Sequence, residues 1–138
     1  ARYDGRKALE MAAVSLTMGR LNEAQLAEFR ILADQTAKHV EGEKILDREE
    51  FIRTNDLYHD FLFRQTGNPH LRAAYEALEV AEDMAALQTG GWISADIIKE
   101  HYELVDAFEA NDLAKAMEIV THHAEASKAS MHRARDDA

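Results

Sequence analysis

The stretch that decides the fold runs from Asp47 to Pro69 and reads DREEFIRTNDLYHDFLFRQTGNP. Asp47 followed three residues later by Glu50 is a capping pair that predicts the start of a helix. At the other end, Gly67 suits the left-handed turn after a helix, Asn68 caps the next helix, and Pro69 fits a first turn that needs no amide donor. Because one helix closes and another opens within a few residues, we expect the two to be antiparallel neighbours.

Similar helix-capping and helix-ending residues divide the rest of the chain. Asn22 with Gln25 three residues on is a variant of the capping box, and glycines, Asx residues and Ser94 lie where other helix ends are expected. No strand-like alternation competes with the helical pattern. We therefore expect an all-α single domain over residues 1–138, an antiparallel bundle of six to seven helices. The expected helices are Asp4 to Met18, Asn22 to Gly42, Asp47 to Thr66, Pro69 to Leu87, Ser94 to Ala110, and a last one that opens after Asn111-Asp112 and frays at 133–137.

Composition excludes several classes of function. The 16 basic and 26 acidic side chains give a net charge of −10, so the surface repels nucleic acid and anionic membranes. The absence of cysteine excludes disulfides, thiolate metal sites and thiol nucleophiles. No apolar run approaches the roughly 20 residues that a membrane-spanning helix needs. We expect a cytoplasmic domain that contacts neither DNA nor membrane directly.

Three of the seven histidines fall on apolar helix faces. His101 and His123 lie at the centres of the apolar stripes of the last two expected helices, and His59 lies one turn after Asn55 on the third. His122 points about 100° away from its neighbour. The stripes are formed by Ile97, Ile98, Leu104, Val105 and Phe108, by Ala116, Ile119, Val120 and Ser127, and by Phe51 and Leu62.

One histidine on an apolar face is more often a satisfied core residue than a metal ligand. Three on separate helices favour a shared cation, because each buried imidazole must find partners or leave a polar group unsatisfied, at about 1–3 kcal/mol. Nitrogen-rich ligation without sulfur suits Zn²⁺, Ni²⁺ or Co²⁺ and tolerates Mn²⁺ or Fe²⁺. The predicted ligands of one divalent ion are Asn55, His59, His101 and His123, whereas His39, His70, His122 and His132 are expected to be solvated.

Motifs over nearly the whole chain resemble a known family. Arg6 precedes Glu10 by four residues, Asn55 precedes His59 by four ahead of Gly67-Asn68-Pro69, and a 22-residue gap separates His101 from His123. In this order and spacing they resemble the FCD domain, the C-terminal effector-sensing domain of GntR-type bacterial transcription regulators.

The resemblance implies a fold, a site and partners. Such domains are bundles of six or seven helices that usually dimerise. By position, their metal ligands correspond to Asn55 and the three histidines, and the arginine that meets a small carboxylate effector beside the metal corresponds to Arg6. Asn55 stands where Asp is commoner, and the adjacent Asp56 is a conceivable substitute on a neighbouring face. The family's N-terminal winged-helix DNA-binding domain is absent, so we expect regulation of DNA to belong to a longer parent.

Two other functions remain open. A site of three histidines and one oxygen can activate water in a metalloenzyme, but no separate acid–base pair accompanies these histidines, and we expect no enzyme. The alternative is a dimerisation module with a structural metal. As outer partners of the imidazoles we expect Tyr58, Glu100 or Asp106.

Overall fold

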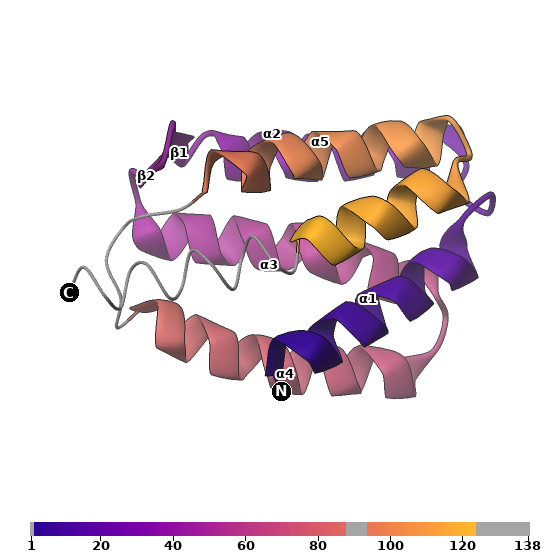
Figure 1. Cartoon of the computed structure of the whole chain (residues 1–138), viewed down its shortest axis with the longest axis horizontal. Helices are drawn as coiled ribbons and strands as arrows, with labels where there is room; N and C mark the ends of the chain where they lie inside the picture. Colours follow the sequence, from indigo (N-terminus) through magenta and orange to yellow (C-terminus); the bar gives the residue numbers. More distant parts are fainter. Residues whose placement is uncertain (1, 88–93, 124–138) are drawn as a thin grey trace.

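A computed structural model of the chain describes residues 2–87 and 94–123. Six helices dominate these residues, so the predicted all-α bundle is confirmed (Figure 1). The helices are α1 (Arg2–Thr17), α2 (Glu23–Ala37), α3 (Arg48–Gln65), α4 (Pro69–Leu87), α5 (Ala95–Glu109) and a further helix over residues 113–123.

The long helices pack around α3. α2 packs on both α3 and α5, while α4 packs on α3 and on α1, which also contacts α3. In Figure 1, α2 and α5 lie along one side of the molecule and α4 along the other, with α3 between them. None of the described helices is long and apolar enough to cross a membrane.

The predicted capping residues begin the helices. Asn22 and Gln25 form a reciprocal box, with Asn22 Oδ1 accepting from the Gln25 amide at 2.8 Å. Asn68 Oδ1 accepts two amides of the first turn of α4, and Ser94 caps α5. Gly67 adopts φ +67°, the left-handed conformation predicted for a glycine that follows the end of a helix.

The second helix is shorter than predicted. α2 ends at Ala37, not at Gly42, and a small antiparallel hairpin follows, made of β1 (Val40–Glu41) and β2 (Lys44–Ile45). Gly42 has φ +62° and forms the turn of this hairpin, so it does not close the helix. The hairpin joins a second apolar cluster made of Val40, Ile45, Phe51, Ile52, Ile97 and Ile98.

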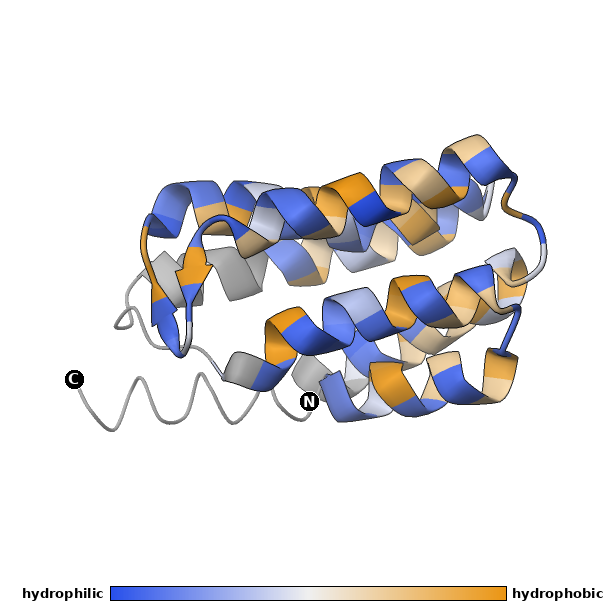
Figure 2. Cartoon of the chain, turned by 90° about the horizontal axis from the view of Figure 1, so that it is seen from above, coloured by the Kyte–Doolittle hydropathy of each residue, from blue (hydrophilic) through white to orange (hydrophobic). Residues whose placement is uncertain are grey.

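The main core lies between the helices, and hydrophobic and hydrophilic bands alternate along each helix as burial of one face requires (Figure 2). Phe29 of α2 is central: its ring stacks on Tyr58 and Phe61 of α3 at centroid distances of 5.1 and 4.9 Å. Phe108 of α5 meets the same ring edge-on at 5.7 Å. This aromatic stack fixes α3 against α5, the two helices that carry His59 and His101.

Candidate metal centre

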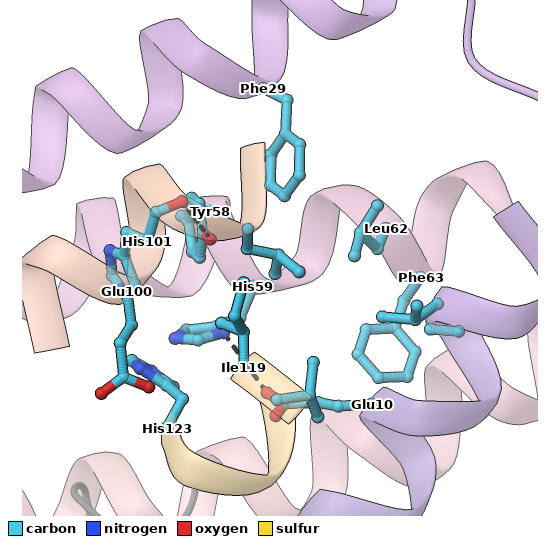
Figure 3. Close-up of a pocket in the computed structure, with 14 residues that line it drawn as sticks. Glu10, Phe29, Tyr58, His59, Leu62, Phe63, Glu100, His101, Ile119 and His123 are labelled. Atoms are coloured by element: carbon cyan, nitrogen blue, oxygen red, sulfur yellow. Dashed lines mark hydrogen bonds and ion pairs between the residues drawn. The ribbon is translucent and has the colours of Figure 1, made fainter. Parts of the chain in front are cut away.

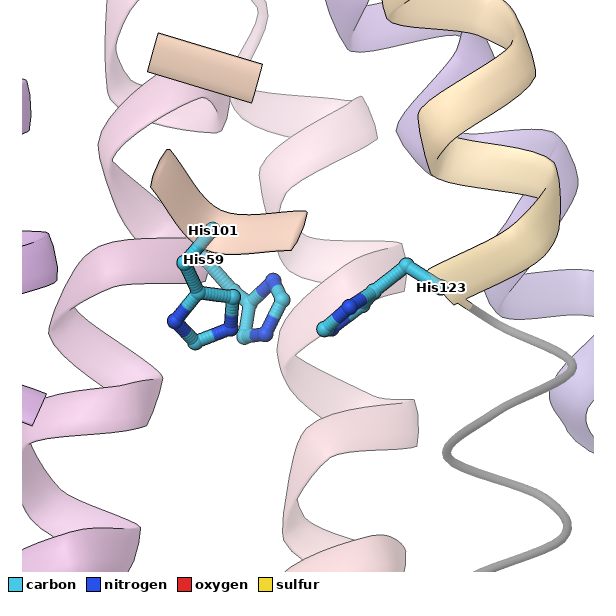
Figure 4. A group of neighbouring side chains, drawn as sticks. All are labelled: His59, His101 and His123. Atoms are coloured by element: carbon cyan, nitrogen blue, oxygen red, sulfur yellow. The ribbon is translucent and has the colours of Figure 1, made fainter. Parts of the chain in front are cut away.

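Three histidines from three helices converge in the interior (Figure 4). His59 lies on α3, His101 on α5 and His123 at residues 113–123, and all three are buried. Their ring centroids are 5.2 Å apart for His59 and His101, 5.3 Å for His59 and His123, and 5.0 Å for His101 and His123. One nitrogen from each ring lies within 4.8 Å of the other two, a spacing that allows all three to reach one cation.

Two of these rings lack the hydrogen bonds that a buried imidazole needs. Neither nitrogen of His101, which is 1 % exposed, has a hydrogen-bond partner within residues 2–87 and 94–123, nor does Nδ1 of His123. One turn before His59, the buried Oδ1 of Asn55 also lacks a partner in this part of the chain. Unsatisfied buried polar atoms are rare, and here they include the nitrogens of two of the three converging imidazoles, a residue type that binds divalent metals. The donor set therefore fits a metal ion.

His59 is different, because both of its nitrogens are engaged. Nδ1 lies 3.3 Å from Oε1 of Glu10, and Nε2 lies 3.1 Å from Nη2 of Arg6. A guanidinium only donates, so Nε2 accepts, and Nδ1 then carries the proton and donates to the carboxylate. Arg6 also donates from Nε to Glu10 Oε1 at 3.1 Å. Arg6, Glu10 and His59 thus form a buried triad between α1 and α3.

The Glu10 carboxylate is held ionised within the triad. Burial by itself raises its pKa, but the charge of Arg6 and the hydrogen bond from His59 outweigh burial and lower the pKa to about 2. Glu10 is the outer partner of a cluster imidazole that sequence reasoning missed. Arg6 and Glu10 were one turn apart on a face shared with Ala13 and Val14, and a charged pair on an apolar face was the signal.

The two remaining rings stay neutral. Desolvation by burial, followed by repulsion from His123 and His59, lowers the pKa of His101 well below its ordinary value. Burial and the neighbouring His59 and Arg6 likewise lower the pKa of His123. Neutral imidazole is the form that ligates metals, so both rings are ready ligands at neutral pH.

Of the three outer partners expected from the sequence, Tyr58 and Asp106 take other roles, whereas Glu100 lines the same cavity as the histidines. Tyr58 stacks on the His101 ring at 3.9 Å and donates its hydroxyl to the His101 backbone carbonyl at 2.9 Å, so it holds the residue but neither ring nitrogen. Glu100 Oε1 lies 2.8 Å from Nδ1 of His122, while its buried Oε2 has no hydrogen-bond partner among the described residues. Asp106 accepts from Arg30 on the surface.

The other histidines with described side chains lie away from the cluster. His122 is exposed, as its position beside a buried neighbour predicted, and His70 is exposed as well. His39 is half-buried, and His132 lies outside the described residues. Asp56 does not belong to the metal-binding group found among the described residues.

A small cavity of about 30 Å³ borders the cluster (Figure 3). Its polar lining consists of Glu10 from α1, Glu100 and the three histidines, and core side chains complete it. A water molecule needs roughly 10–15 Å³ on this measure, so the space admits an ion with one or two waters but no larger molecule. The apolar lining includes Ala13, Val14, Phe29, Leu62, Phe63, Leu104, Ile119 and Val120.

Comparisons with known proteins agree with the fold. The model of one family, the FCD domain, matches residues 2–126. The structure of E. coli McbR/YncC superposes with a TM-score of 0.76 at 21% sequence identity, covering 93% of this chain and 61% of that one. At this identity the likeness concerns the fold, and the chain spans about three fifths of the length of that protein. No curated protein sequence matches the chain.

Proposed function

The chain belongs to the FCD domain family, and on that premise we propose that it is the effector-sensing domain of a GntR-type transcription regulator, binding one divalent metal ion and a small carboxylate beside it. The proposed metal ligands are Asn55, His59, His101 and His123, and the proposed carboxylate partner is Arg6. Zn²⁺, Ni²⁺, Co²⁺ and Mn²⁺ are the candidate ions.

The observation that carries the proposal is the state of His101. Its ring is fully enclosed, uncharged at neutral pH, and without a hydrogen bond to either nitrogen among the described residues. Core histidines that serve only packing satisfy at least one nitrogen, because a buried unsatisfied polar group costs about 1–3 kcal/mol. A cation shared with His59 and His123 removes this penalty for all three rings together.

Local charge supports an anionic effector. In the triad the charges of Arg6 and Glu10 offset each other, and the histidines and Asn55 are neutral ligands. A bound divalent ion supplies a local positive charge and open coordination positions for an anion. A domain with a net charge of −10 needs such a local cation to attract a carboxylate.

The size of the cavity supports sensing. About 30 Å³ does not admit a carboxylate of several carbon atoms, so effector binding requires the surrounding helices to move apart. The cluster joins α3, α5 and residues 113–123, and a ligand that binds better to the open arrangement shifts their packing. In the proposed parent protein, a homodimer in the cytoplasm, this shift reaches a separate DNA-binding domain.

Native mass spectrometry of the purified protein, before and after chelation, tests the function. We expect one divalent ion per chain, a dimer, and a further mass gained on adding succinate as a probe carboxylate. Metal that stabilises the fold without carboxylate binding would favour a structural role. Turnover of candidate substrates would favour the metalloenzyme. A chain that takes up no divalent ion would end the proposal.

A further inference from the structure

We propose that Arg6 occupies the metal-binding nitrogen of His59 in the metal-free protein, so that metal loading displaces Arg6 and releases it to the carboxylate. The inference rests on the proposed function and adds an order of binding to it. Arg6 is thereby a switch between two partners, and metal binding becomes the condition for effector binding.

The first step is the tautomer of His59. Because the Arg6 guanidinium only donates, Nε2 of His59 carries the lone pair, and the proton lies on Nδ1, 3.3 Å from Glu10 Oε1. A carboxylate on one imidazole nitrogen commonly accompanies a metal on the other, because it fixes the ring and raises its basicity. Nε2 is therefore the nitrogen of His59 that faces a metal, and Glu10 is its positioning residue.

The second step is that this nitrogen already has an occupant. Nη2 of Arg6 lies 3.1 Å from Nε2 of His59 and donates to its lone pair. One lone pair cannot serve a guanidinium and a metal ion together, and the two positive charges repel at such a distance. His101 and His123 carry no competing hydrogen bond at the nitrogens described above. Of the three imidazoles, His59 is the one whose ligation requires an exchange of partners.

The third step concerns what Arg6 does when it is displaced. Its Nε holds Glu10 at 3.1 Å, and this contact does not involve the nitrogen that faces the metal. The side chain therefore stays anchored on α1 while its Nη2 donors turn away from His59. In that position the donors can meet a carboxylate on the metal. Because binding couplings are reciprocal, carboxylate must tighten metal as much as metal tightens carboxylate.

Long-range ¹H–¹⁵N spectra of the wild-type protein give the first test and need no variant. In the metal-free protein we expect His59 Nε2 to have the ¹⁵N chemical shift of a hydrogen-bond acceptor. We expect the protons on Arg6 Nη2 to exchange slowly with water. Adding one equivalent of Zn²⁺ should change both the His59 Nε2 chemical shift and the Arg6 Nη2 signal, while the proton on His59 Nδ1 that is donated to Glu10 stays in place. Persistence of the Arg6 signal at full Zn²⁺ occupancy, or loss of the Nδ1 proton, would overturn the inference.

Calorimetric titration with Zn²⁺ alone gives the second test. Arg6→Met keeps the aliphatic stem and removes the donors, so the metal no longer competes with them. If Arg6 holds Nε2 for nine tenths of the time, the variant binds Zn²⁺ about tenfold more tightly. Arg53→Met is the matched control, because Arg53 lies on the same helix as His59 but pairs with Glu50 on the surface. It removes the same charge and should leave the affinity unchanged.

The outcomes separate this inference from the proposed function. Equal Zn²⁺ affinity of the wild type and Arg6→Met refutes displacement and leaves a metal-binding sensor in place. Equal tightening by Arg6→Met and Arg53→Met assigns the effect to net charge and also refutes displacement. Absence of Zn²⁺ binding in all three proteins refutes the proposed function itself.

Discussion

His101 shows how one residue can reveal a site. A histidine in the middle of an apolar stripe is chemically ambiguous, and its meaning depends on what its two nitrogens meet. Here the ring stacks on Tyr58, and neither nitrogen finds a hydrogen bond among the described residues. His123 meets the same ring from another helix, at a centroid distance of 5.0 Å. Side chains with unused lone pairs that face each other have the geometry to hold a cation.

Substituting the histidines singly tests their assignment. His101→Ala and His123→Ala should each abolish stoichiometric metal, because two remaining imidazoles cannot complete the set. His122→Ala should retain it, since that ring is exposed and pairs with Glu100. Metal content by atomic emission, on protein shown to be folded by circular dichroism, checks the prediction. Equal loss in all three variants would contradict the assignment.

Asn55 sets the charge of the proposed site. Asn55→Asp adds one negative charge beside the ion, so metal affinity should rise and carboxylate affinity should fall. A tenfold change in either constant corresponds to about 1.4 kcal/mol. Calorimetry with Zn²⁺, and then with succinate on the Zn²⁺-loaded protein, measures both. Tighter succinate binding by the variant would show that charge does not govern the effector.

The residues of the cluster were predictable from sequence, but their partners were not. His59, His101 and His123 were selected because helical periodicity places them on inward faces, and the structure brings these three together. Glu10 was missed because it comes from α1, and no periodicity reports which face of one helix meets which residue of another. The same limit explains why Asp106, which faces Arg30, was expected near the imidazoles.

Among the helices, α3 and α5 define the site. Tyr58 links them twice, by stacking on the His101 ring and by a 2.9 Å hydrogen bond to the His101 carbonyl. Phe29 of α2 then packs against the other side of this pair through Tyr58 and Phe108. Rigid support of this kind lets two imidazoles from different helices hold a fixed separation.

Removing the tyrosine hydroxyl tests this link. Tyr58→Phe keeps the ring stack and deletes one buried hydrogen bond, so the free energy of unfolding should fall by about 1 kcal/mol. Tyr102→Phe is the control, because the Tyr102 hydroxyl bonds Asp34 on the surface, and its loss should change stability by less than about 0.5 kcal/mol. Urea unfolding of the metal-free proteins measures both. Equal losses would show that Tyr58 contributes no specific link between the helices.

The end of α2 shows what element prediction missed. Asp47 was correctly predicted to cap the next helix, whereas Gly42 was predicted to close α2 and instead forms the hairpin turn. The two strands of the hairpin are only two residues each, which is too short for an alternating pattern to appear. Helix existence and type were predictable because many residues share one period, whereas a two-residue strand depends on its pairing partner.

At the scale of the whole molecule, the buried cluster makes metal-free stability depend on pH. His101 and His123 have lowered pKa values in the folded state, so the unfolded chain binds more protons below about pH 6.5. The contribution of the two histidines to folding stability is therefore fully present above the pKa of an unfolded histidine and is lost as the pH falls below that value. Glu10, with its pKa lowered to about 2, adds a loss in the same direction at pH values below its unfolded pKa of 4.5.

Unfolding of the chelated protein across this range checks the sign. The free energy of unfolding should decrease steadily from about pH 7 to pH 5, and His101→Leu should have a shallower decrease because one titrating ring is gone. His70→Leu, at an exposed position, should match the slope of the wild type. Stability that rises toward pH 5 would contradict the burial of neutral imidazoles.

The domain combines a bundle held by apolar packing with one polar cluster in its interior. Burial of three imidazoles beside the aromatic core is unfavourable unless their nitrogens find partners. The imidazoles lie where α3, α5 and residues 113–123 meet, and the cavity beside them is too small for a multi-carbon effector. The proposed sensing function therefore requires these helices to repack when an effector fills the site.

X-ray absorption spectroscopy of the Zn²⁺-loaded protein tests the central claim most directly. If the three imidazoles share the ion, the spectrum will show nitrogen and oxygen neighbours at about 2.0–2.1 Å, with the outer-shell scattering of three imidazole rings. His101→Ala would reduce the ring scattering or abolish binding. A first shell of oxygen alone, without imidazole scattering, would contradict the account.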